Sequence, residues 1–143
     1  LQKFNDELMN YIQMWGLEDT VSFTDKVSPN QLKSFILNSD IFLCLSEHEG
    51  FCVPLIESQY YELPIIAVKS SAIAETLGPE QLVFDTFNED SIAAAIHEVS
   101  LNKDFSDYLT RKGKENFEKR FTQSIIEQRF IHYIDRVIKE VII

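Results

Sequence analysis

Two carboxylates bracket a short turn near the middle of the chain. Glu49 precedes Gly50, Glu57 follows Pro54, and seven residues lie between the two acids. An ionised carboxylate accepts charge-assisted hydrogen bonds from hydroxyl groups, each worth about 1.5–3 kcal/mol. Carboxylates on either side of a turn could therefore hold the hydroxyls of a diol.

The backbone of the same turn suits an anion. Pro54 favours the start of a helix, so the N–H groups of residues 50–53, of Leu55 and of Ile56 are expected to have no acceptor inside that helix. Gly50 lets a ligand approach the backbone closely, and a helix N-terminus favours negative charge by roughly 0.3–1 kcal/mol per interaction. A pyrophosphate could lie against these N–H groups while the carboxylates hold hydroxyls.

These acids also have a purely structural reading. Taken alone, Glu49 and Glu57 would be acids at a helix start, stabilised by the helix dipole. His48 beside them could suggest acid–base or metal chemistry, but the chain lacks the second His and the helical spacing of a zinc protease motif, so no metal site is predicted. Glu75 is expected to cap or solvate a short helix rather than to contact a ligand.

Buried strands are expected before and after the turn. The apolar run 41–45 precedes it, and further strand-like runs occupy residues 64–68 and 82–84. A helix is predicted over residues 54–61, with Glu57 in its first turn. Strands that alternate with helices predict a parallel sheet with right-handed crossovers, in which ligands bind beyond the carboxyl ends of the strands. The turn lies at such an end.

The chain before this region predicts a helix, a short strand and a second helix. Apolar residues from Leu1 to Trp15 recur at helical spacing, and Gly16 offers a left-handed stop. Residues 21–23 form a short β-prone run. A capping box is predicted at Ser28, Pro29 and Gln31.

Three further helices are predicted after the last strand. Asn88 or Asp90 caps the first, Phe105 lies near the start of the second, and Thr122 caps the third, which runs to about Ile143. The whole pattern predicts one Rossmann-like α/β domain over residues 1–143, with a doubly wound parallel sheet and C-terminal helices.

Charge and cysteine content narrow the function classes. The formal net charge of −10 argues against a broad basic surface, so nucleic acid is not an expected partner. Cys44 and Cys52 are too few for a disulfide framework, and Cys44 falls in an apolar run where a buried thiol is expected. We expect a cytoplasmic protein, with peripheral attachment to the membrane left open for the full-length form.

The turn and its flanks resemble the signature of glycosyltransferase family 4. The matching residues are Ser46, Glu49, Gly50, Phe51, Pro54, Leu55 and Glu57, followed by Leu63 to Ala67 and by Ala74 and Glu75. The resemblance covers roughly residues 5–140. Members of that family have the two-domain GT-B fold, so the resemblance implies the C-terminal, donor-binding half of a retaining glycosyltransferase.

The resemblance also implies roles for individual residues. In the family, the residue matching Glu57 holds the ribose hydroxyls of a nucleotide-sugar donor, and the residue matching Glu49 contacts the transferred sugar, which makes Glu49 the predicted catalytic residue. The predicted donor-binding residues are Gly50, Phe51, Cys52, Val53, Glu57 and Thr24, with Thr24 near the nucleotide base. No cofactor other than the donor substrate is predicted.

Several positions depart from the family pattern. Cys52 stands where a second glycine is common, Ser58 where alanine is common, and Glu62 where glycine is usual. Cys52 narrows the space beside the sugar and therefore bears on donor preference. The cations that neutralise the pyrophosphate in the family lie upstream of Leu1, so we expect a domain truncated at its N-terminus.

The predicted activity is transfer of a sugar from a nucleotide-diphosphate sugar to a glycan or lipid-linked acceptor, in the synthesis of a polysaccharide or glycoconjugate. The expected partners are the donor, that acceptor and a missing N-terminal domain of the same protein, without which this fragment is expected to be inactive. Two alternatives stay open at this point. One is a non-catalytic regulatory or assembly module, and the other is a different GT-B enzyme, such as a sugar-nucleotide epimerase or a starch-synthase-like enzyme.

Overall fold

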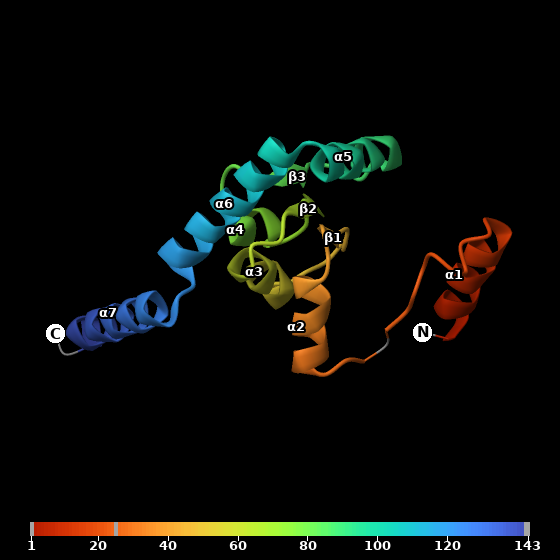
Figure 1. Ribbon diagram of the computed structural model, residues 1–143. Helices are drawn as coiled ribbons and strands as arrows, with labels where there is room; N and C mark the ends of the chain where they lie inside the picture. Colours follow the sequence, from red (N-terminus) through yellow and green to blue (C-terminus); the bar gives the residue numbers. More distant parts are fainter. Residues whose placement is uncertain (1, 25, 142–143) are drawn as a thin grey trace. The chain divides into compact units, whose positions relative to one another are not determined.

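A computed structural model describes the backbone of residues 2–24 and 26–141 and the side chains of residues 6–24 and 26–140 (Figure 1). Leu1 and Ile143, the outer ends of the first and last predicted helices, lie outside the described residues. The chain divides into two compact units, residues 1–32 and residues 33–143, which are described separately below. The proposal of one truncated domain with a missing partner domain stays a prediction.

The first unit contains helix α1, which spans Gln2–Met14. Gly16 ends it with a left-handed backbone (φ 63°), and the N–H of Leu17 donates to the carbonyl of Ile12 at 2.9 Å. The predicted left-handed stop is therefore confirmed. The predicted strand at residues 21–23 is wrong, because the structure has no regular structure there, and Phe23 is 53% exposed. A strand needs a neighbouring strand for its backbone groups, whereas the N–H of Val21 donates to the carbonyl of Leu17 at 2.9 Å and no described strand pairs with this segment.

Helix α2, Pro29–Leu37, begins with the predicted capping box. The N–H of Ser28 donates to Oε1 of Gln31 at 2.9 Å, and the N–H of Gln31 donates back to Oγ of Ser28 at 3.4 Å. Two N–H groups at the helix start are thus satisfied by side chains, which fixes where the helix begins.

The second unit is built on a three-stranded parallel sheet with the order β1-β2-β3. Its strands are β1 (Phe42–Cys44), β2 (Ile65–Val68) and β3 (Leu82–Phe84). Its remaining helices are α3 (Val53–Tyr60), α4 (Ile73–Leu77), α5 (Glu89–Leu101), α6 (Lys103–Arg120) and α7 (Gln123–Val141). Helix α3 connects β1 to β2, and α4 connects β2 to β3. Each of the three strands predicted for this unit is present within one or two residues of its expected bounds.

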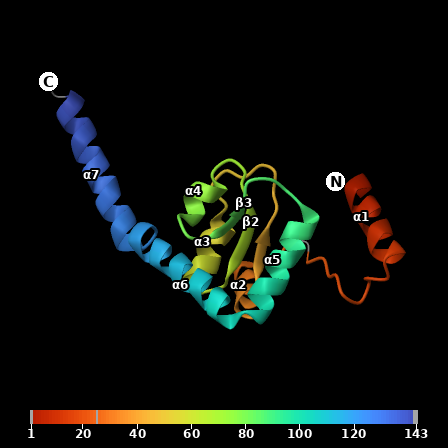
Figure 2. The same cartoon turned by 90° about the horizontal axis from the view of Figure 1, so that it is seen from above.

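Helices cover both faces of this sheet, as Figure 2 shows for α3 and α4 on one side and α5 on the other. Side chains alternate along β2, so Ile65 and Ala67 face one core and Ile66 faces the other. The first core adds Cys44, Leu55, Ile73 and Leu77, and the second adds Ala95, Val99 and Leu109. All four residues of β2 are buried, which explains why its sequence is apolar without alternation.

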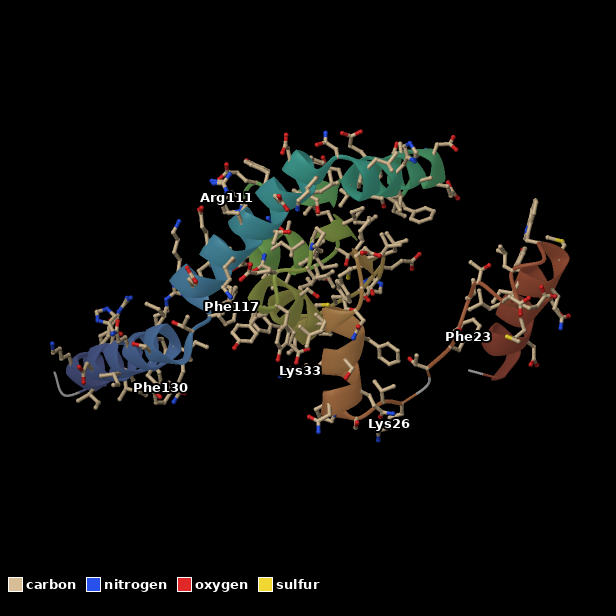
Figure 3. The ribbon with its side chains drawn as sticks, in the orientation of Figure 1. Phe23, Lys26, Lys33, Arg111, Phe117 and Phe130 are labelled. Carbon is tan, nitrogen blue, oxygen red and sulfur yellow. The ribbon has the colours of Figure 1, made fainter. Side chains whose placement is uncertain are left out.

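The sequence predicts some, but not all, of the residues that cap the C-terminal helices. Oδ1 of Asn88 accepts the N–H of Ser91 at 2.8 Å, so Asn88 rather than Asp90 caps α5. Asn102 caps α6 in the same way. Helix α7 follows Thr122 as expected, and its apolar side chains are exposed, with Phe130 at 64% (Figure 3). None of the described helices is long and apolar enough to cross a membrane.

Candidate functional site

The site begins where β1 ends, at the carboxyl edge of the parallel sheet. Residues 45–52 lead from that strand to the start of α3 without regular structure. Gly50 is exposed, and a Cβ built on it would meet no atom within 4 Å. The backbone of the turn is therefore open to a ligand on the side of Gly50.

Cys52 is the residue immediately before α3, and its backbone is left-handed, with φ 52° and ψ 70°. A residue with a side chain adopts this conformation at a cost of roughly 1–2 kcal/mol, which glycine avoids. The sequence pattern marked Cys52 only as a bulky side chain where glycine is common. The left-handed backbone is a second reason why glycine would suit this position.

The backbone N–H groups of the turn are mostly available. Among the described residues, none accepts a hydrogen bond from the N–H groups of residues 50–53. The N–H of Leu55 is not available, because it donates at 3.0 Å to the carbonyl of Cys52, which lies just before the helix. The anion-binding potential is thus confined to the turn itself and does not extend to Leu55.

The two carboxylates flank these N–H groups. Glu49 and Glu57 are both half-buried, and the carboxylate of neither takes part in a hydrogen bond or ion pair with any described residue. Glu57 lies in the second turn of α3, not in the first as expected, because the helix starts at Val53, and no acid occupies its first turn. A purely structural role for Glu57 as an acid at the helix start is therefore weakened.

Glu49 lies beside two thiols. One carboxylate oxygen of Glu49 and the Sγ atoms of Cys44 and Cys52 all lie within 4.8 Å of one another. Burial, and to a smaller extent Cys44 and Glu49 nearby, raise the pKa of Cys52 from an ordinary 9.0 to about 11. Both cysteines are free, and at neutral pH Cys52 is a protonated thiol and a poor nucleophile.

Phe51 ties the turn to the rest of the unit. Oγ1 of Thr76 donates to the carbonyl of Phe51 at 3.3 Å. The ring of Phe51 packs edge-on against Phe121, with ring centroids 5.8 Å apart. These contacts connect the turn to α4 and to the end of α6, and both helices therefore support the turn.

A buried polar network lies behind this support. Nδ2 of Asn116 donates to Oε1 of Gln59 at 2.9 Å and to the carbonyl of Thr76 at 3.0 Å. Nε2 of Gln59 donates to the carbonyl of Leu77 at 2.9 Å. The guanidinium of Arg120 donates to the carbonyl of Glu75 at 2.6 Å. Side chains of α3 and α6 therefore satisfy the last carbonyls of the short helix α4.

The sequence analysis missed this network, although a signal was present. Asn116 and Arg120 fall at helical spacing from Phe105 and Leu109, on the face of α6 that packs against the unit. Polar residues at such positions indicate a buried polar contact. Glu75 lies in the first turn of α4 with an exposed side chain, as expected for an acid that solvates a helix start.

A cleft of about 480 Å³ opens at the carboxyl ends of all three strands. Ser46 and Glu47 line it after β1, Ser70 after β2, and Asp85 after β3. Glu49 and Glu57 do not line it. The cleft nevertheless places open space where α/β sheets of this kind bind ligands.

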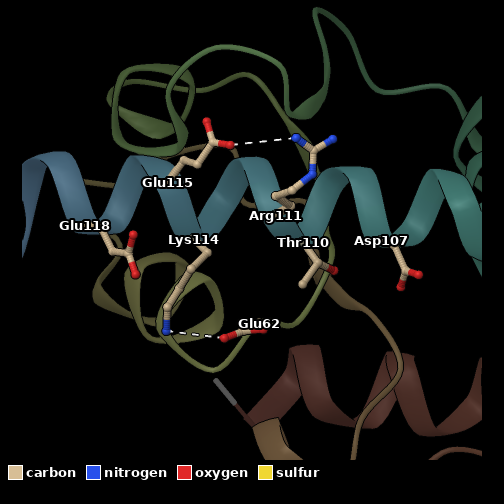
Figure 4. Close-up of a pocket in the computed structure, with 7 residues that line it drawn as sticks. All are labelled: Glu62, Asp107, Thr110, Arg111, Lys114, Glu115 and Glu118. Atoms are coloured by element: carbon tan, nitrogen blue, oxygen red, sulfur yellow. Dashed lines mark ion pairs between the residues drawn. The ribbon is translucent and has the colours of Figure 1, made fainter.

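A second hollow of about 450 Å³ runs along α6 (Figure 4). Its charged side chains pair with one another: Lys114 with Glu62 at 3.4 Å, and Arg111 with Glu115 at 3.8 Å. Such exposed pairs are typical of a solvated helix face. This hollow is therefore a weaker candidate than the turn.

Six of the seven predicted site residues lie in one unit of the structure. Glu49, Gly50, Phe51, Cys52, Val53 and Glu57 lie in the second unit, between β1 and the middle of α3. Thr24 lies in the first unit, in an exposed segment without regular structure. Its predicted position near a nucleotide base stays a prediction. His48 is exposed in the turn.

Known proteins resemble this chain in sequence. The family described as "Glycosyl transferases group 1" matches residues 2–116. The O-antigen biosynthesis glycosyltransferase WclY of Escherichia coli is 26% identical over 142 residues, which are 99% of this chain and 38% of WclY. An MMP alpha-(1->4)-mannosyltransferase of Mycolicibacterium hassiacum is 28% identical over 65 residues, 46% of this chain and 16% of that protein. The chain thus spans well under half the length of these relatives.

Solved structures resemble it in fold. A sucrose-phosphate synthase from Thermosynechococcus elongatus superposes with a TM-score of 0.78 at 19% identity, over 94% of this chain and 34% of that one. The C-terminal domain of a glycosyl transferase group 1 family protein from Francisella tularensis gives 0.71 at 20% identity, over 85% of this chain and 64% of that one. The predicted fold, a Rossmann-like parallel sheet of the C-terminal half of GT-B proteins, is confirmed.

Proposed function

The chain belongs to the family of glycosyl transferases group 1, and on that premise we propose that it is the donor-binding domain of a retaining glycosyltransferase. In this proposal the donor is a nucleotide-diphosphate sugar, which binds at the turn between β1 and α3. Its sugar passes to a glycan or lipid-linked acceptor.

One observation carries the proposal. Glu49 and Glu57 are half-buried, and their carboxylates have no hydrogen-bond or ion-pair partner among the described residues. They flank the N–H groups of residues 50–53, which donate a hydrogen bond to no described residue. Groups of this kind are costly to leave unpaired at a partly buried position. A ligand that carries both hydroxyls and a phosphate would form hydrogen bonds with the two carboxylates and with the N–H groups of the turn at once.

The roles follow from the chemistry of each group. Glu57 accepts hydrogen bonds from the ribose hydroxyls, and Glu49 accepts them from hydroxyls of the transferred sugar. The N–H groups of residues 50–53 face the pyrophosphate. When the bond between the sugar and the pyrophosphate breaks, negative charge develops on a phosphate oxygen, and fixed N–H dipoles stabilise that charge without reorganisation.

The acceptor and the wider context are inferred from the relatives. One of them is named for O-antigen biosynthesis and another for mannosyl transfer, which supports the synthesis of a polysaccharide or glycoconjugate. Because this chain spans 38% of WclY, we propose that an N-terminal domain outside it binds the acceptor. The isolated chain then binds donor weakly and does not turn over. A cytoplasmic location, peripheral to the membrane in the full-length protein, suits a lipid-linked acceptor.

Calorimetric titration of the full-length protein with UDP, GDP, ADP and their sugars tests this proposal. We expect one of these nucleotide sugars to bind and Glu57→Ala to weaken it by about tenfold to hundredfold for each hydrogen bond lost. Glu118→Ala is the matched control, since Glu118 is an exposed acid in the hollow along α6 and should leave affinity unchanged. Binding that is absent, or equal in the two variants, would show the site assignment to be wrong.

A further inference from the structure

Cys44, Glu49 and Cys52 place three metal-ligating atoms at the carboxyl end of β1. The two Sγ atoms and a carboxylate oxygen lie within 4.8 Å of one another. Over residues 6–24 and 26–140, no other group of His, Cys, Asp and Glu side chains gathers three ligand atoms in this way. The cluster therefore differs from the acidic patches elsewhere on the surface.

The geometry is near that of a bound zinc ion. Zinc–thiolate bonds are about 2.3 Å long, so two ligands of a tetrahedral ion lie about 3.8 Å apart. The atoms here lie within 4.8 Å and can close the remaining gap by side-chain rotation. Cys44 is fixed at the end of a strand and Cys52 at the start of a helix, so the two thiols are held at this separation by regular structure.

The ligand chemistry favours a thiophilic divalent cation. Two thiols and one carboxylate resemble the three-ligand zinc sites that leave a fourth position open. Glu49 has no ion pair with the described residues, and Cys44 and Cys52 are free. On binding, two S–H bonds break, two S–metal bonds form, and both protons pass to water.

There is also room for the fourth ligand. Gly50 lies between Glu49 and Cys52 in the chain, is exposed, and has no atom within 4 Å of the position of a Cβ. Apart from its chain neighbours Glu49 and Phe51, no residue therefore crowds the Cβ position of Gly50.

We propose that Cys44, Glu49 and Cys52 form a site for Zn²⁺ or another thiophilic divalent cation, with water as the fourth ligand. If the proposed function is correct, the ion also has a regulatory effect, because it withdraws Glu49 from the sugar. The metal-loaded protein then binds nucleotide sugar more weakly than the metal-free protein.

Cobalt provides a spectroscopic test on the reduced, metal-free full-length protein. We expect Co²⁺ to bind at one ion per chain with a thiolate-to-metal charge-transfer band and the intense visible bands of tetrahedral cobalt, and Zn²⁺ to displace it. Cys52→Gly should weaken Co²⁺ binding at least tenfold and reduce the charge-transfer band. Glu49→Gln should weaken binding while the band persists.

The control variant is His132→Gln, which removes a potential ligand on α7 and should change neither band. Absence of the charge-transfer band, or a band unchanged in Cys52→Gly, overturns the proposal. Cys52→Gly alone decides the question if Cys44→Ser, which alters the core, does not fold.

A second titration separates this proposal from the proposed function. Nucleotide-sugar affinity should fall at least tenfold with Zn²⁺ in the natural protein and stay unchanged with Zn²⁺ in Cys52→Gly. A protein that binds Co²⁺ through its thiols but binds no nucleotide sugar retains the metal site and refutes the donor site. The reverse result refutes the metal site alone.

Discussion

The side-chain amide of Asn116 in α6 donates to the side-chain carbonyl of Gln59 in α3 across 2.9 Å, and both residues are buried. The same amide reaches the carbonyl of Thr76, whose hydroxyl holds the carbonyl of Phe51. Two residues 57 positions apart thus connect the long helix α6 to the turn that carries the candidate site. The support of that turn depends on polar contacts as well as on apolar packing.

Removal of the Asn116 amide tests this support. Asn116→Ala leaves the buried oxygen of Gln59 without its donor, so we expect a loss of about 1–3 kcal/mol in the free energy of unfolding. Urea denaturation followed by circular dichroism measures it. Gln128→Ala, on the exposed surface of α7, is the control and should change stability by less than about 0.5 kcal/mol. Equal effects would contradict a structural role for the network.

Substitution by alanine should have different effects at two glycines, Gly78 and Gly50. Gly78 has φ 76° and ψ −174°, a region used almost only by glycine, and a Cβ there would collide with the side chain of Asn116. Gly78→Ala should therefore cost at least about 1–3 kcal/mol of stability. Gly50→Ala meets no neighbour and should leave the melting temperature unchanged while it weakens nucleotide-sugar binding. Thermal unfolding and calorimetry compare the two variants.

The left-handed backbone of Cys52 predicts a ranking of substitutions. Cys52→Gly removes the conformational cost of roughly 1–2 kcal/mol, which offsets the lost packing and the greater freedom of the unfolded chain. Its stability should stay within about 1 kcal/mol of the natural chain. Cys52→Val should be clearly less stable, because a β-branched residue is poorly tolerated at this φ. A valine variant as stable as the glycine variant would show that residue 52 is not left-handed in solution.

The raised pKa of Cys52 predicts slow alkylation. A shift from 9.0 to about 11 lowers the thiolate fraction at pH 8 by about a hundredfold relative to an ordinary cysteine. The reaction of the metal-free protein with iodoacetamide should therefore rise about tenfold per pH unit up to about pH 11. Mass spectrometry of the modified peptide gives the rate, and the denatured chain is the reference. A plateau near pH 9 would indicate that burial does not affect this thiol.

The strands were predictable because each is a short apolar run bounded by turn residues. Leu82–Phe84 was predicted at its observed bounds, and the capping box at Ser28 and Gln31 was predicted from local spacing alone. Residues 21–23 have the composition of a strand, but composition does not supply the neighbouring strand that pairing requires.

The candidate site was predictable in position and less so in detail. Side chain types and a family resemblance placed it at the turn, but its contacts depend on backbone angles that no local pattern reveals. The φ of Cys52 allows its carbonyl to accept the N–H of Leu55, which removes one expected anion donor. The approach of Cys44 to Glu49 and Cys52 likewise depends on the path of the chain between them, so the residue spacing alone did not predict a metal site.

The strand order has a consequence for work with the isolated chain. Within the described residues β1 pairs with β2 on one side only, so it is an edge strand, and it is also the strand that leads into the turn. Unpaired backbone groups along an edge recruit strands from other molecules, which causes aggregation. Preparations of residues 1–143 alone therefore call for light scattering over a range of concentrations, since self-association through β1 would alter the loop that binding assays are meant to probe.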